Sequence, residues 1–186
     1  MIASSETSSD EILELNGSGA DFKKKVEKKI GSGFNRCLHC HTCAGGCPFS
    51  RSMDPKPNGV IRMIQLGLQT EAFECPTIWI CVGCHTCAVQ CPMAIDIAGV
   101  MDAVRQLALA EKANISEPAI YDFHKEVLRS VERYGRTHKL EIMMRYKMKR
   151  HDWFTDMNTG LRMFAKHKLE LFPSRVKDTE AIRQLF

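Results

Sequence analysis

The 186-residue chain lacks several features that would each indicate a class of protein. No uninterrupted apolar run reaches about 18 residues, the length that a membrane-spanning helix needs. The first residues have neither the basic segment nor the apolar core that a secretory signal has. No glycine-rich loop with the spacing of a flavin or nicotinamide site is present. We therefore expect a cytoplasmic protein with no membrane span and no nucleotide cofactor of its own.

Cysteine, by contrast, is abundant, with nine copies in the chain. Because the cytoplasm is reducing, these cysteines need a role other than disulfide formation. Eight of them form two copies of one pattern, C-x2-C-x2-C-x3-C-P. The copies begin at Cys37 and Cys81, 44 residues apart, and read CLHCHTCAGGCP and CVGCHTCAVQCP. This internal duplication predicts two sites of the same kind.

The spacing of the eight cysteines is typical of [4Fe–4S] clusters. Three thiolates at i, i+3 and i+6 can bind three corners of one iron–sulfur cube, and in this run the fourth cysteine ligates the other cluster. The proline after the fourth cysteine helps the chain to turn away from the loop. The alternative, structural zinc, fits less well because zinc sites use two separated pairs of cysteines. We therefore predict one cluster on Cys37, Cys40, Cys43 and Cys91, and a second on Cys81, Cys84, Cys87 and Cys47.

The remaining candidates near the motifs are expected to be supporting residues. Cys75 lies outside both copies, and the chain lacks three further ligands for another cluster, so we expect it not to be a ligand. His39, His41 and His85 lie inside the cysteine loops. Since eight cysteines already fill two sites, we expect these histidines to be exposed or to hydrogen-bond to cluster sulfur. Trp79 is expected to shield a cluster from water.

Helical periodicity recurs along the chain and strand signals are almost absent, which predicts an all-α fold with two cluster-binding loops. Between the motifs, Asn58 can cap an apolar helix that ends near Gly67 and is buried between the two loops. The helix after Pro118 has one apolar face, made of Ile120, Phe123, Val127, Val131 and Tyr134. Further helices are expected at 21–30, within 68–80 with a break before Pro76, from Asp96 to about Lys112, from Pro118 to Gly135, and around 138–149, 158–169 and 178–186.

The residues around the cysteines indicate a family. Residues 34–48, FNRCLHCHTCAGGCP, closely resemble the C subunit of the heterodisulfide reductase of methanogenic archaea. So do residues 78–92 around the second motif and IRMIQLGL at 61–68. The resemblance covers residues 34–110 well and the C-terminal helices weakly. The cysteine motifs alone are shared with the α-helical ferredoxin domains of succinate dehydrogenase and glycolate oxidase.

This resemblance implies a fold and a role. In that family, the C subunit is similar in fold to α-helical ferredoxins. It carries electrons from the A subunit, which binds FAD, to the B subunit, which reduces the mixed disulfide of coenzyme M and coenzyme B in methanogenesis. A hydrogenase or formate dehydrogenase can supply the electrons to the larger complex. The resemblance thus implies a non-catalytic electron-relay subunit of an oxidoreductase, with the A and B subunits as partners, and the lack of a membrane span favours the soluble complex.

The chain is accordingly divided into three parts: an N-terminal arm and short helix at 1–33, an α-helical ferredoxin domain with two clusters at 34–113, and a C-terminal helical extension for subunit docking at 114–186. The first 20 residues are interpreted as a mobile arm, or as an arm that orders on a partner through Ile12, Leu13 and Leu15.

Two other functions stay open at this point. One is a cluster relay subunit of a different dehydrogenase, with succinate- or glycolate-type chemistry, which the identity of its partner would reveal. The other is a cluster-containing regulator that binds nucleic acid through residues 130–151, which hold seven Lys or Arg and two Glu. No recognised nucleic-acid motif accompanies that segment, so we favour a solvated face or a docking face for an acidic partner protein and expect no nucleic-acid partner.

Overall fold

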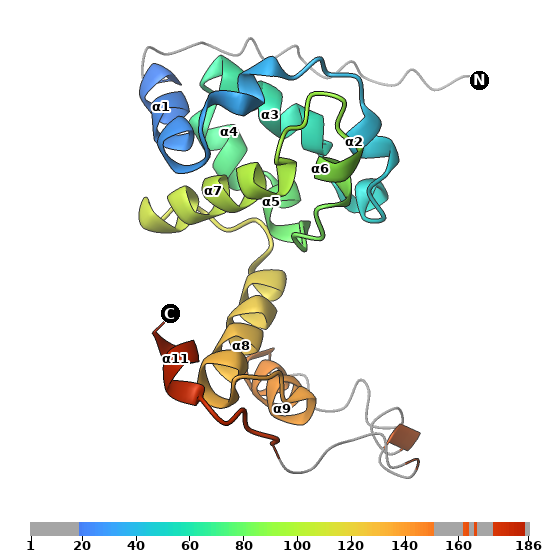
Figure 1. Cartoon of the computed structure of the whole chain (residues 1–186), viewed down its shortest axis with the longest axis vertical. Helices are drawn as coiled ribbons and strands as arrows, with labels where there is room; N and C mark the ends of the chain where they lie inside the picture. Colours follow the sequence, from blue (N-terminus) through green and yellow to red (C-terminus); the bar gives the residue numbers. More distant parts are fainter. Residues whose placement is uncertain (1–18, 151–161, 164–165, 167–172, 185–186) are drawn as a thin grey trace, which may run out of the picture. The chain divides into compact units, whose positions relative to one another are not determined.

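The computed structural model describes residues 19–150, 162–163, 166 and 173–184. All regular elements in these residues are helical, and no strand occurs among them, which confirms the predicted helical fold class for the described chain (Figure 1). The chain divides into two compact units, one up to Ser116 and one from Glu117. Residues 1–18 of the arm expected at 1–20, and nearly all of the helix expected at 158–169, lie outside the described residues.

The first unit contains two longer helices at its centre, α3 (Pro57–Leu66) and α7 (Ile97–Ala110), and both pack against α1 (Gly19–Ile30), α4 (Gln69–Glu74) and α5 (Pro76–Ile80). Two short helices, α2 (Thr42–Gly45) and α6 (Thr86–Gln90), lie against one another and against the central pair (Figure 1). Single 3-10 turns at Ser32–Arg36 (η1) and Ser50–Ser52 (η2) complete the unit.

The core of this unit comes mainly from apolar side chains of α1, η1, α3, α4, α5 and α7. Its most deeply buried large side chains are Phe22, Val26, Phe34, Val60, Ile61, Ile64, Ile78, Trp79, Val100, Met101 and Val104. The Phe22 ring of α1 meets the Phe73 ring of α4 edge to face, with 5.2 Å between centroids. Each fully buried side chain of this size stabilises the fold by about 1.5–3 kcal/mol, so the core fixes the helices that carry the cysteine loops.

The ends of the helices follow the local signals in the sequence. Asp96 caps α7, because its Oδ1 accepts a hydrogen bond from the Gly99 amide at 3.0 Å. A proline occupies the first turn of α3, α5 and α8 (Pro118–Tyr134), where no amide hydrogen is needed. Gly67 and Gly135 end α3 and α8 in the left-handed region, with φ values of 75° and 72°.

One predicted cap is wrong. Helix α3 begins at Pro57, the residue before it is Lys56, and no side chain caps this end. Asn58 therefore lies inside the first turn and is 8% exposed. Proline, with its fixed φ, starts the helix two residues before the start that a cap at Asn58 predicts.

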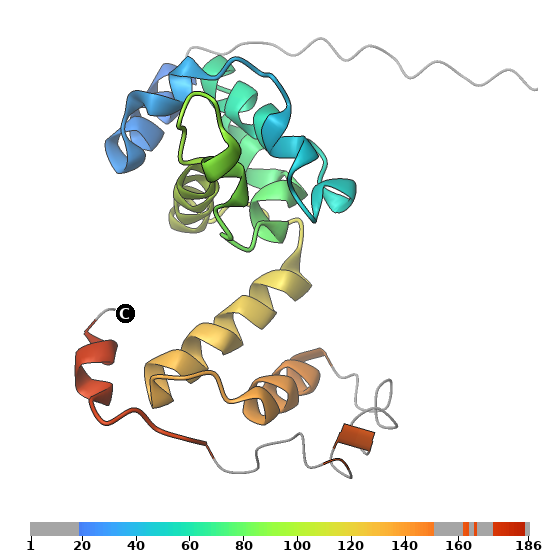
Figure 2. The ribbon, with the colours of Figure 1, turned by 45° about the vertical axis from the view of Figure 1, so that its right-hand side comes forward.

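The second unit contains α8, α9 (Lys139–Arg150) and α11 (Thr179–Arg183), and α8 packs against both of the others (Figure 2). The predicted apolar face of α8 is only partly covered, since Phe123 is exposed. The buried positions of this helix are Glu126, Ser130 and Tyr134. Of these, only Tyr134 belongs to the predicted face; the pattern missed Glu126 and Ser130 because their partners on and before α9 are polar.

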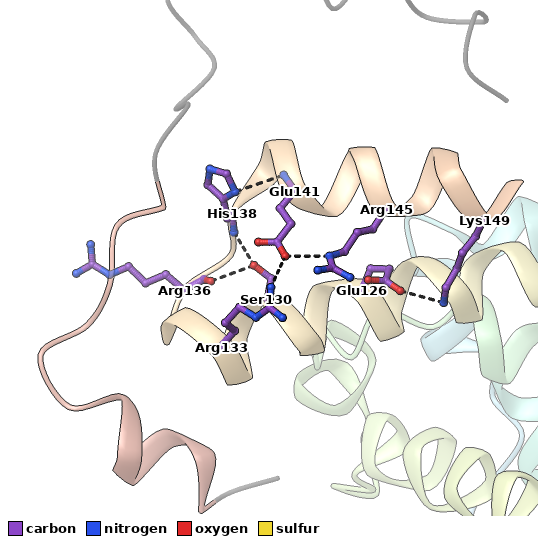
Figure 3. A network of polar contacts seen from close by, with 8 residues as sticks. All are labelled: Glu126, Ser130, Arg133, Arg136, His138, Glu141, Arg145 and Lys149. Carbon is purple, nitrogen blue, oxygen red and sulfur yellow. Dashed lines mark hydrogen bonds and ion pairs between the residues drawn. The ribbon is translucent and has the colours of Figure 1, made fainter. Parts of the chain in front are cut away.

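Figure 3 shows that polar pairing. The Glu126 carboxylate lies 2.9 Å from Lys149 Nζ, and Ser130 Oγ accepts a hydrogen bond from the His138 amide at 2.8 Å. Glu141 lies 3.0 Å from Arg133 and 2.9 Å from Arg145. Burial alone would raise the pKa of Glu141, but hydrogen bonds from Tyr134 and Arg145 outweigh it and lower the pKa below its usual value. The α8–α9 pair is thus held by ion pairs as well as apolar contacts.

Candidate metal centre

The two cysteine motifs have the same local structure. Each begins at an extended cysteine directly after a short helix, η1 before Cys37 and α5 before Cys81. In each motif a histidine in the left-handed region, His41 (φ 63°) or His85 (φ 58°), then turns the chain into the short helix α2 or α6. The sequence duplication is therefore a structural duplication.

The loops line two pockets, and each pocket combines cysteines from both motifs. Cys37, Cys40 and Cys43 line the first pocket together with Cys91 of the second motif. Cys81, Cys84 and Cys87 line the second pocket together with Cys47 of the first motif. Ile97, the first residue of α7, lines both pockets. The structure thus brings together the same two sets of four cysteines that the spacing predicts as ligand sets.

One cysteine in each pocket is exposed and has a lowered pKa. Cys40 Sγ lies 3.3 Å from Thr42 Oγ1, and Cys84 Sγ lies 3.4 Å from Thr86 Oγ1. Hydrogen bonding with these hydroxyl groups, and with the backbone of the same threonines, lowers the pKa of both thiols. The identical Cys-His-Thr sequence in the two copies produces this shared feature.

The more buried cysteines have raised pKa values. Burial raises the pKa of Cys43 and Cys81. Burial also raises the pKa of Cys87, to about 11, and the nearby thiols of Cys81 and Cys43 add to this effect. The influence of Cys43 on Cys87 also reflects the proximity of the two motifs. Because metals bind thiolates, filling these pockets with iron must release protons.

The pockets fit the chemistry of an all-cysteine [4Fe–4S] cluster. Four thiols surround each one, and the walls include apolar residues such as Met101 and Ile95. Within the described ranges, no three His, Cys, Asp or Glu side chains converge as the ligands of a single metal ion do. With all four irons of each cluster bound by cysteine, no iron would be open to a substrate.

Two side chains that the sequence did not single out support the loops. Arg105 of α7 donates hydrogen bonds to the carbonyl of Ile78 at 2.6 and 2.9 Å and to the carbonyl of Cys81 at 2.7 Å. At the equivalent place in the first copy, Gln65 of α3 donates to the Phe34 carbonyl at 3.3 Å. Phe34 and Ile78 are 44 residues apart, which is the repeat distance. The repeat does not reveal Gln65 or Arg105, because the helices that carry them are not part of the duplicated sequence.

The other predicted supporting residues are spread over the unit. Cys75 is buried, donates from Sγ to the Ala72 carbonyl at 3.3 Å, and lines neither pocket. Trp79 is buried in the core. His39 Nε2 lies 3.0 Å from Gln65 Oε1, and His85 Nδ1 lies 3.4 Å from Asp96 Oδ1.

Comparison with known proteins first gives a match to a protein family. Residues 33–95 match the family described as a 4Fe-4S dicluster domain, a range that contains all eight motif cysteines. This match agrees with the pair of [4Fe–4S] sites that the spacing predicts.

Three curated relatives are named after the C subunit of heterodisulfide reductase. Over 118 residues the chain is 30% identical to the C subunit of the H(2):CoB-CoM heterodisulfide,ferredoxin reductase of Methanothermobacter marburgensis, covering 63% of this chain and 60% of that protein. It is 36% identical to the iron-sulfur C subunit of the CoB–CoM heterodisulfide reductase of Methanopyrus kandleri, over 53% and 56% of the two chains. It is 37% identical to a protein of Archaeoglobus profundus named as like the C subunit of heterodisulfide reductase, over 53% and 50%.

These matches confirm the resemblance to the C subunit of heterodisulfide reductase. The chain spans 60% or less of the length of these relatives. Among the residues that the structure describes, no helix has the length and apolar character to cross a membrane.

Proposed function

We propose that each pocket binds one [4Fe–4S] cluster. Cys37, Cys40, Cys43 and Cys91 ligate the first, and Cys81, Cys84, Cys87 and Cys47 ligate the second. The grouping of the cysteines around two pockets, each with a ligand contributed by the other motif, is the single observation that carries this proposal. The residues from 34 to 113 then form an α-helical ferredoxin domain.

The chemistry of two closed clusters is electron transfer. Each cluster accepts and passes one electron, and none of its irons has a free position at which a disulfide could be cleaved. The thiol that remains, Cys75, is solitary and buried, so no cysteine pair is left for thiol exchange. The chain therefore relays electrons within an oxidoreductase and has no disulfide-reducing activity by itself.

The names of the relatives point to the reaction that the relay serves. We propose that the chain is the iron–sulfur C subunit of a cytoplasmic heterodisulfide reductase complex. It would pass electrons from the FAD-containing A subunit to the B subunit, which reduces the disulfide of coenzyme M and coenzyme B. A hydrogenase or formate dehydrogenase is the expected source of electrons in the larger complex.

Docking to a partner is assigned to the C-terminal extension, residues 114–186. Helix α9 has five Lys or Arg and one Glu, and its Met143, Met144 and Met148 are exposed. Flexible methionine side chains among cations suit an adaptable contact with an acidic surface. Replacing Lys147 and Arg150 by Glu should weaken association with the partner proteins while leaving the iron content unchanged.

The decisive test is reconstitution from separate components. The protein isolated under anaerobic conditions should contain about eight irons and eight acid-labile sulfides, because two four-iron clusters are proposed. Alone it should be reduced by a low-potential donor but should not cleave the heterodisulfide. Turnover should appear only when the FAD-containing and the disulfide-reducing partners are both added. Stoichiometric zinc without sulfide, or rapid disulfide reduction by this chain alone, would contradict the proposal.

A further inference from the structure

Asn58 is a buried polar residue that lines one of the two pockets. It lies in the first turn of α3, is 8% exposed, and faces the pocket of Cys37, Cys40, Cys43 and Cys91. Its side-chain oxygen is shielded from solvent and has no hydrogen-bond partner. Burying an amide without partners destabilises a protein. An unpaired amide in the wall of a ligand pocket therefore indicates a partner in the ligand.

The second pocket has no equivalent group. Leu38, His41 and Thr42 of the first pocket are matched by Val82, His85 and Thr86 of the second. The further polar residue there, Thr77, is already paired, since its hydroxyl donates to the Pro55 carbonyl. Among the described residues that line the pockets, Asn58 alone is polar, unmatched by the repeat and without a hydrogen bond.

We propose that the amide of Asn58 donates an N–H···S hydrogen bond to the cluster bound by Cys37, Cys40, Cys43 and Cys91. This inference rests on the proposed cluster sites. An amide has two N–H donors, and the sulfide and thiolate sulfurs of a cluster are acceptors. Oxygen and nitrogen exchange places by a half-turn of the amide, so the donor reaches the cluster without a change in the backbone.

Such a bond sets the reduction potential of one cluster and not of the other. When a [4Fe–4S] cluster with four thiolates accepts an electron, its net charge changes from −2 to −3, and a donor at sulfur stabilises the more negative state. Asn58 therefore raises the potential of the first cluster. At the second cluster, the potential is influenced by a different group, the Arg105 guanidinium that donates to the Cys81 carbonyl. Each cluster therefore has its own side chain that adjusts its reduction potential.

The test is a redox titration of the anaerobic holoprotein followed by electron paramagnetic resonance. Asn58→Leu has nearly the same size and no donor, and it should lower one of the two midpoint potentials while the other stays unchanged. Asn58→Asp adds a negative charge and should lower the same potential further. Arg105→Gln keeps a hydrogen-bond donor but removes the cation, and it should lower the other potential. If Asn58→Leu retains eight irons and shifts neither midpoint, the proposal is wrong.

A second measurement needs no variant and decides the matter if Asn58→Leu fails to bind iron. In protein whose asparagine side chains carry ¹⁵N, pulsed paramagnetic resonance of the reduced clusters should detect a nitrogen coupling at one cluster. Absence of that coupling in the unmodified protein overturns the role of Asn58 whatever the variants do. Failure of the proposed function looks different, because the unmodified protein would then lack cluster signals altogether.

Discussion

The contact between α1 and α3 depends on two glycines, and the structure predicts what an alanine at each would do. Gly67 has a φ of 75°, and a Cβ there would lie 2.3 Å from the Gly19 Cα. At Gly19 a Cβ would lie 2.7 Å from the Gly67 Cα. Because backbone atoms oppose each added carbon, the strain is relieved only if α1 moves away from α3.

The loss of unfolding free energy in Gly67→Ala can be calculated from the side chains that α1 buries. The left-handed conformation alone costs an alanine about 1–2 kcal/mol. Moving α1 also exposes part of Phe22 and Val26, which are both 0% exposed and are each worth about 1.5–3 kcal/mol when fully buried. Gly67→Ala should therefore destabilise the protein by about 3 kcal/mol or more. At a slope of about 1–3 kcal/mol per molar urea, this loss lowers the unfolding midpoint by about 1–3 M.

Gly31→Ala is the matched control. Gly31 ends α1 with a φ of 77°, and a Cβ there meets nothing within 4 Å, so only the conformational cost remains. Gly19→Ala shows whether the contact is close enough to reverse the usual preference. Alanine inside a helix is favoured over glycine by about 1 kcal/mol when nothing obstructs it, so destabilisation by Gly19→Ala would support the close contact. The assay is urea unfolding of the anaerobic holoprotein, followed by circular dichroism. Equal shifts for Gly67→Ala and Gly31→Ala, or stabilisation by Gly19→Ala, would refute the close contact.

Three further outcomes are expected. In the apoprotein near neutral pH, Cys40 and Cys84 should be alkylated before Cys87, and raising the pH toward 11 should speed the reaction of Cys87. Peptide mass spectrometry measures the order of alkylation, and equal rates at the three cysteines would contradict this prediction. Cys47→Ala should abolish the paramagnetic signal of the second cluster and spare the first, whereas loss of the first would refute the exchange of ligands between motifs. The pKa of Glu141 is lower in the folded than in the unfolded protein, so its ionised form stabilises the fold above the unfolded pKa. This stabilisation is lost as the pH falls through the folded pKa. Thermal unfolding between about pH 5 and pH 2 should therefore show that acid destabilises the wild type more than Glu141→Gln.

The sequence predicted those features that depend on local chemistry. The cysteine spacing predicted the dicluster domain, and Asp96, Pro118 and Gly135 marked helix ends that the structure confirms. These signals are readable because a cap or a fixed φ acts within a few residues of its own position. The cap at Asn58 failed for the same local reason, since the neighbouring Pro57 is the stronger start signal.

The features that the sequence did not predict depend on contacts between distant residues. Arg105 lies 24 residues from Cys81, whose carbonyl it binds, and Gln65 lies 31 residues from Phe34. The buried polar face of α8 was missed because Glu126 is buried only where Lys149 of α9 pairs with it. Periodicity shows which residues share a face of a helix, but it does not show which charge on another helix will meet that face.

The duplication supplies two similar sites, and the helices that follow the motifs make them different. Cysteine, histidine and threonine repeat at the same spacing, so the ligands and the exposed thiols are shared. The loop supports do not repeat: a neutral amide, Gln65, holds one loop and a cation, Arg105, holds the other. Since charge and hydrogen bonding near a cluster set its potential, the two proposed clusters would have different potentials. In the proposed relay, this difference would come from the side chains of α3 and α7 and not from the cluster ligands, which are the same at both sites.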